Sequence, residues 1–155
     1  MTKNKSFKYQ RQLEELLLQG CQLPKLYKPN DMHACRFAFS SGERTNHLPQ
    51  YVSNPKRMLQ DIKRGKSDTS LLALSCFDSA ERAVAFYKNL TKAFKNTALT
   101  IGDALAEGNL SNDDGLKSST GQNGHFDFYE YVNCDLNKSF HITKQITEDK
   151  YYENN

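Results

Sequence analysis

The chain has little of several features that would place it in a large class of proteins. No apolar run among its 155 residues approaches the roughly 20 residues that a membrane-spanning helix needs. Residues 1–8 are polar and basic and lead into no apolar segment, so we expect no secretion signal. Neither sign of charge dominates, because 21 Lys and Arg stand against 18 Asp and Glu, giving a net charge of +3 and a pI of about 8.6. The composition predicts a soluble protein without membrane contact, and it neither requires nor excludes a polyanionic partner.

Motifs for metal binding, nucleotide binding and nucleophilic catalysis are also missing. The four cysteines form no C-x-x-C pair, and the four histidines never stand four residues apart on a helix, so we predict no metal site and no cofactor. Cys35 and Cys76 lie in apolar runs, where a free cysteine behaves as a small buried hydrophobic residue. A reduced, cytoplasmic protein is the simplest interpretation.

What is present suffices for one folded domain, 1–155. The nine Phe and eight Tyr are too many for a disordered chain, and the length fits a single domain. Apolar spacing predicts helices at 6–19, 54–65 and 78–95, and strands at 32–39, 70–77, 125–132 and 136–143. The segment 98–106 fits either a strand or a strand followed by a turn, because it contains Gly102. We expect loops at 40–53 and 108–124, an extended connector at 21–31 and a polar, frayed tail at 144–155.

The order of these elements predicts an α+β fold. The strand at 70–77 is almost continuously apolar, as in the middle of a sheet, and with the following helix it resembles one crossover unit. The short stretch 133–135 between the last two strands predicts an antiparallel C-terminal hairpin. We therefore expect a mixed sheet of about five strands with about three helices, and residues 1–31 supply the N-terminal helix and its connector.

Two sequence signals mark helix starts. Asn54-Pro55 places a capping side chain before a proline at the first helical position. Asp78 stands three residues before Glu81, in the spacing of a capping box. These signals predict the beginnings of the second and third helices.

A basic segment from Arg36 to Arg64 contains the first candidate site. Its members are cations, a histidine and a tyrosine: Arg36, Arg44, His47, Tyr51, Lys56, Arg57, Lys63 and Arg64. Lys56 and Arg57 fall in the first turn of their helix, where the macrodipole disfavours cations unless an anion offsets the cost. The segment indicates either an anion or nucleic-acid contact surface, or a solvated helix face beside a polar loop.

Four polar residues on predicted strands form a second candidate, a catalytic cleft: His33, Arg36, Ser75 and Glu130. Polar side chains at sheet positions are costly to bury unless they are paired. This set of residue types is similar to the set found in ADP-ribosyltransferase sites, and the resemblance implies group transfer from a nucleotide such as NAD. Phe128, however, stands where arginine-modifying members carry a second acidic or amide residue. The alternative is local pairing, with Arg36 bound to Glu130 and Ser75 bound to backbone.

Tyrosines on the predicted hairpin form a third candidate. Tyr129 and Tyr131 share a strand face, and tyrosine is favoured in protein interfaces. The alternative is that the first helix covers this face. Since no catalytic motif is evident, we expect a non-catalytic interaction module, an accessory or regulatory subunit that binds a partner protein through the hairpin and the loop 40–53. Nucleic-acid contact is the second hypothesis and a nucleotide-utilising transferase the third.

Overall fold

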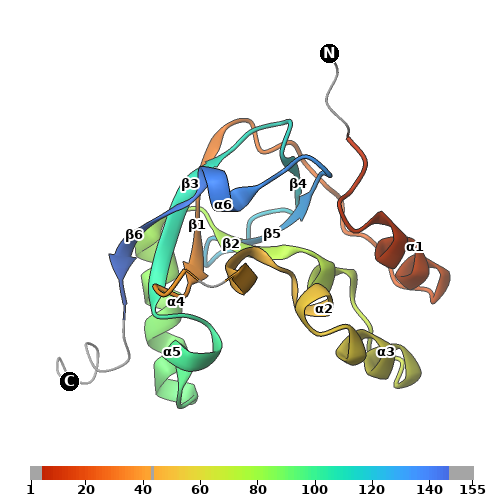
Figure 1. Cartoon of the computed structure of the whole chain (residues 1–155), viewed down its shortest axis with the longest axis horizontal. Helices are drawn as coiled ribbons and strands as arrows, with labels where there is room; N and C mark the ends of the chain where they lie inside the picture. The colour runs from red at the N-terminus through yellow and green to blue at the C-terminus, as the bar shows by residue number, and fades with distance from the viewer. Residues whose placement is uncertain (1–4, 43, 147–155) are drawn as a thin grey trace.

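The computed structural model describes residues 5–42 and 44–146, without the side chains of residues 44 and 45. Within these residues the chain forms six α-helices, two 3-10 helices and six strands (Figure 1). In chain order they are α1 (Gln10–Leu18), β1 (Met32–Ala38), η1 (Arg44–His47), α2 (Gln50–Ser53), α3 (Pro55–Lys63), η2 (Thr69–Leu72), β2 (Leu74–Phe77), α4 (Ala80–Ala93), α5 (Thr97–Thr100), β3 (Ala104–Leu110), β4 (Gly115–Lys117), β5 (His125–Glu130), α6 (Leu136–Ser139) and β6 (His141–Gln145). The fold is α+β, as the sequence predicts.

The strands form one curled sheet in the order β4-β5-β2-β1-β3-β6 (Figure 1). Every neighbouring pair is antiparallel, so the expectation of a mixed, five-stranded sheet was wrong. Because β2 and β3 are both antiparallel to β1, they run in the same direction with β1 between them. Helix α4 therefore does make a crossover, but it passes over an intervening strand.

Two cores lie on the two faces of the sheet. On one face, Cys35, Phe77 and Leu105 pack with Ala83 of α4. On the other, the strands pack against the segment that contains α6, through a cluster that includes Ala34, Cys76, Phe126, Phe128, Cys134, Leu136 and Phe140. A third core joins α1 to the α2–α3 region through Leu13, Leu16, Tyr51, Met58 and Leu72. The cysteines are free, and three of the four are buried, as expected for Cys35 and Cys76.

The capping signals are confirmed at one helix and displaced at the other. The Asn54 side chain accepts a hydrogen bond from the backbone N–H of Arg57, with Pro55 as the first helical residue of α3. At α4 the cap is Ser79, whose hydroxyl accepts from the N–H of Arg82, and not Asp78. The backbone N–H of Asp78 instead bonds to the carbonyl of Gly124, which continues the β2–β5 pairing by one residue and delays the helix.

The prediction of a C-terminal hairpin was wrong. Asp135 caps the short helix α6, and Leu136 and Phe140 are buried against the sheet. This turn of helix redirects the chain, so that β6 pairs with β3 at the far edge of the sheet instead of with β5. The apolar spacing of 136–143 therefore reflected a helical turn followed by an edge strand.

Several other expected boundaries also change. The loop 40–53 contains η1 and α2, and the strand expected at 98–106 begins with most of α5 before β3 starts at Ala104. The loop 108–124 includes the end of β3 and all of β4, which pairs with β5. The strand expected at 70–77 is shortened to β2 because η2 occupies its first residues. Of the expected frayed tail, Lys144 and Gln145 belong to β6, Ile146 is buried, and 147–155 lie outside the described residues.

No helix in the described residues has both the length and the apolar composition needed to cross a membrane.

Candidate functional site

A groove of about 490 Å³ opens beside the sheet. One wall comes from α4, α5 and the residue that follows α5, and it includes Phe86, Leu90 and Ile101. A second wall comes from the segment 46–53, which includes Leu48 and Pro49. Ligand cavities in proteins typically occupy about 300–1,000 Å³ and combine apolar walls with a few polar groups. Part of the loop that the sequence indicated as an interaction element therefore lines this groove.

The polar floor of this groove comes from two paired strands. Ser75 of β2 lies directly opposite Asp127 of β5, and His125 lies one diagonal step away on the same face. The Ser75 Oγ and His125 Nε2 atoms are 2.6 Å apart, and Asp127 Oδ1 lies 3.8 Å from that same nitrogen. Burial raises the pKa of Asp127, while the neighbouring His125 lowers it to a smaller extent. The floor thus offers a hydroxyl, an imidazole and a carboxylate to an occupant.

This trio does not have the geometry of a hydrolase triad. In such a triad the carboxylate holds one imidazole nitrogen while the other takes the serine proton. Here Ser75 and Asp127 both approach Nε2 of His125. The carboxylate therefore does not orient the ring from Nδ1, and the arrangement is better suited to hydrogen bonding than to nucleophilic attack.

A buried arginine fastens one wall of the groove to the sheet. Arg36 is only 8% exposed and donates to the carbonyls of Ser75 and Asn46, at 2.5 and 3.1 Å. Its Nε also donates to Nδ1 of His47, at 3.1 Å. Burial, and secondarily the guanidinium, lowers the pKa of His47 to about 4, so this imidazole stays neutral and accepts the bond. The pair holds η1 against the sheet.

The four residues of the predicted catalytic cleft are not all brought together: only Arg36 and Ser75 are in contact. Arg36 and Ser75 are brought together, with the guanidinium on the Ser75 carbonyl. Glu130 is buried at the end of β5, where its Oε2 accepts a 2.8 Å bond from Nζ of Lys8 and not from Arg36. His33 lies elsewhere on β1 and contacts Glu107.

The basic segment is divided between the interior and the surface. Arg36, His47 and Tyr51 are buried, and the Tyr51 hydroxyl donates to Asp61. The cations of α3 and its end are exposed: Lys56, Arg57, Lys63 and Arg64. Arg57 contacts the side chains of Gln50 and Asp61. The side chain of Arg44 lies outside the described part of the structure.

The hairpin tyrosines are covered. Tyr129 and Tyr131 are 3% and 7% exposed, and both rings contact Phe7, which precedes α1. Their side chains therefore lie beneath the N-terminal segment, the alternative that the sequence left open.

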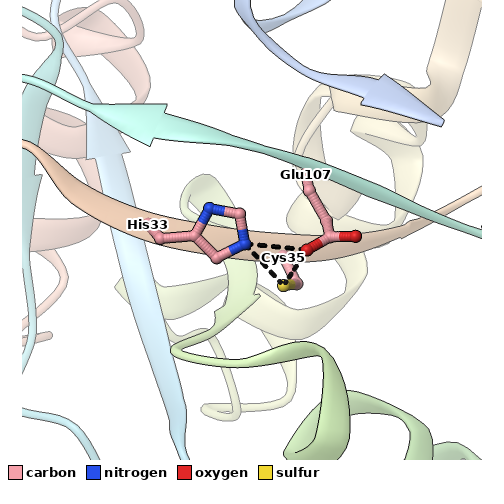
Figure 2. Close-up of side chains that lie close together, drawn as sticks. All are labelled: His33, Cys35 and Glu107. Carbon is pink, nitrogen blue, oxygen red and sulfur yellow. Dashed lines mark hydrogen bonds and ion pairs between the residues drawn. The ribbon is translucent and has the colours of Figure 1, made fainter. Parts of the chain in front are cut away.

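A second polar cluster, which the sequence does not predict, lies on the α4 face of the sheet (Figure 2). It consists of His33 and Cys35 of β1 and Glu107 of β3, with Cys35 directly opposite Glu107. Burial, and then Glu107, raises the pKa of the Cys35 thiol to about 12, so it is no free nucleophile. The sequence signal was the alternation His-x-Cys on a strand, but the partner carboxylate is 72 residues away and could not be paired with it from sequence alone.

No family model, curated protein or solved structure matches this chain.

Proposed function

We propose that the protein is a non-catalytic interaction module whose groove holds a short segment of a partner protein. The observation that carries this proposal is the groove of about 490 Å³, because it combines an apolar wall with hydrogen-bonding groups at the floor. It includes residues of the 40–53 region, one of the two elements from which the sequence predicts partner binding. Strand β5, the second of these elements, lines the groove through His125 and Asp127 and not through its tyrosine.

Exposed apolar side chains close in sequence to the groove residues Leu90 and Ile101 favour a protein segment over a small molecule as the occupant. Ile101 lines the groove and is 40% exposed, while Phe94 and Leu99, at the end of α4 and in α5, are 63% and 77% exposed. Large apolar side chains gathered outside a cavity are typical of protein interaction sites. An occupant that also covers these residues must be longer than the groove.

The floor indicates a cationic side chain on the occupant. Asp127 is the carboxylate that lines the groove, and Asp68 is close enough to raise its pKa further. Three N–H groups of Arg36 are already directed to acceptors within the protein. A lysine or arginine on the partner segment would pair with Asp127, while its apolar neighbours pack on Leu90 and Ile101.

Selection of peptides on the whole chain tests this proposal. Peptides selected from a random displayed library should carry apolar residues and at least one basic residue. Ile101→Asp should weaken their binding at least tenfold, because burial of an aliphatic side chain contributes about 1.5–3 kcal/mol and the added carboxylate would be desolvated. Asp127→Asn should weaken the binding of these peptides, but not of versions in which the basic residue is replaced by alanine.

The matched control is Leu18→Asp, which makes the same kind of change at an exposed aliphatic residue of α1, outside the groove. It should leave peptide affinity unchanged. Equal losses in the Ile101 and Leu18 variants, with unchanged melting temperatures, would mean that the selected peptides bind elsewhere and would contradict the proposal.

The short Ser75–His125 contact favours one enzymatic alternative, a hydrolase with Ser75 as nucleophile. An activated serine reacts with fluorophosphonate probes. We expect no labelling, because the carboxylate does not hold the ring through Nδ1. Labelling of the wild type that is lost in Ser75→Ala would establish the hydrolase instead.

The nucleic-acid hypothesis now depends on the exposed cations of α3. If these bind phosphates, affinity should fall steeply with salt, by roughly one unit of log–log slope for each phosphate contacted. Replacing Arg57 and Arg64 with alanine should then reduce the slope by about two. An unchanged slope would remove this hypothesis.

A further inference from the structure

The His33–Cys35–Glu107 cluster combines three kinds of metal ligand at one point of the sheet (Figure 2). The Nε2 atom of His33 lies 2.7 Å from Oε1 of Glu107 and 3.8 Å from Sγ of Cys35. The Sγ atom lies 3.6 Å from the same carboxylate oxygen. Three donor atoms therefore form a small triangle, as Figure 2 shows.

We propose that this cluster is a zinc site with three protein ligands and a fourth position for water. In tetrahedral zinc, bonds of about 2.0 Å to nitrogen and oxygen and about 2.3 Å to sulfur place neighbouring donors about 3.3–3.5 Å apart. The two sulfur distances already lie within about 0.3 Å of these values. The imidazole and carboxylate must separate by about half an ångström, and the His33 ring is free to move because its side chain is 51% exposed.

The donor types select the metal. Calcium and magnesium prefer oxygen ligands throughout, whereas zinc accepts sulfur, nitrogen and oxygen together. When zinc displaces the thiol proton, Cys35 and Glu107 supply two negative charges to a divalent cation. The site is then neutral, which suits the fully buried sulfur.

The surrounding strands hold the ligands in place. His33 and Cys35 project from the same face of β1, and Cys35 is directly opposite Glu107 in the register of β1 and β3. The hydroxyl of Thr143 donates to Oε2 of Glu107, so Oε1 is the oxygen left for the metal. Thr143 is the residue skipped in the pairing of β6 with β3, an irregularity of the kind that re-aims a side chain. Such outer hydrogen bonds typically orient metal ligands.

Metal titration of the reduced, untagged full chain tests the proposal. We expect one equivalent of Zn²⁺ to bind, and Co²⁺ to give the thiolate charge-transfer band together with the intense visible bands of tetrahedral cobalt. His33→Asn and Glu107→Gln should each weaken binding by at least tenfold, and Cys35→Ser should abolish the thiolate band. Thr143→Val, which keeps the side-chain shape, should weaken binding about 10- to 100-fold.

Cys21→Ser is the control, since this cysteine lies outside the cluster. This variant should bind Zn²⁺ and Co²⁺ as the wild type does. A wild-type chain without the thiolate band, a band that persists in Cys35→Ser, or affinity unchanged in both His33→Asn and Glu107→Gln would overturn the proposal. The His33 variant keeps the test decisive if Cys35→Ser fails to fold, because His33 is largely on the surface.

Discussion

Protonation of His47 should make the protein markedly less stable between pH 7 and pH 5. The folded-state pKa of this histidine is lowered to about 4, by burial first and by Arg36 second, whereas the unfolded-state value is about 6.5. Between these two values the unfolded chain binds more protons than the folded chain, so the free energy of unfolding falls as the pH falls. The stability that His47 contributes is complete above about pH 6.5 and is lost as the pH approaches 4.

The expected size of the effect follows from the two pKa values. Between pH 7 and pH 5 the linkage relation gives a loss of about 2 kcal/mol from this one residue. For a domain of this length, 1 kcal/mol corresponds to about 2–4 °C, so the melting temperature should fall by about 4–8 °C from this cause. The loss should accompany loosening of η1, because the Nδ1 atom of His47 accepts from Arg36.

Urea unfolding of the wild type and His47→Gln at the two pH values measures this contribution. Glutamine retains an acceptor for Arg36 but does not titrate. The variant should therefore lose about 2 kcal/mol less than the wild type on acidification, while the titration of other groups cancels in the comparison. Equal losses in the two proteins would refute the assignment of a buried, neutral His47.

Two further predictions concern stability. Lys8→Met should lower the free energy of unfolding in urea by about 2–3 kcal/mol, because it leaves the buried Glu130 carboxylate without its ion pair. The loss should be smaller at pH 5 than at pH 8, since burial already raises the pKa of Glu130 and protonation removes the unpaired charge. An equal loss at the two pH values would contradict this explanation. Gly102→Ala should lower the free energy of unfolding by at least about 2 kcal/mol in the same assay, because Gly102 has φ +136° and an added Cβ would lie 2.4 Å from the Ala38 carbonyl oxygen. The control Gly121→Ala should have little effect, since the atom nearest to its added Cβ would lie at 3.4 Å. Similar losses at both glycines would argue against the close approach at Gly102.

The parts of the fold that the sequence predicts are those with local signals. Asn54-Pro55 marks the start of α3, and the apolar stripe of α4 predicts its packing, since both signals depend on neighbours within one or two turns. The prediction of a hairpin was wrong because Leu136 and Phe140, four residues apart, fit both a strand pattern and one turn of helix. Periodicity in so short a segment does not separate the two.

The candidate sites were less predictable because they depend on pairing between distant strands. Ser75 meets His125 across 50 residues, and Cys35 meets Glu107 across 72. Their shared faces follow from alternation along each strand, but the register that brings the strands together is set by the whole sheet. For the same reason Glu130 paired with Lys8, from the N-terminal segment, instead of with Arg36 as the sequence suggested.

The most direct test of the proposed groove is the amide NMR spectrum of the whole chain during titration with a selected basic, apolar peptide. Peptide binding in the groove predicts that the largest shift changes fall on both walls and the floor, at Leu90, Ile101, Gln50 and Asp127, and that Leu18 on α1 is unaffected. Changes concentrated on α1 or on the cations of α3, with the groove signals unmoved, would contradict it.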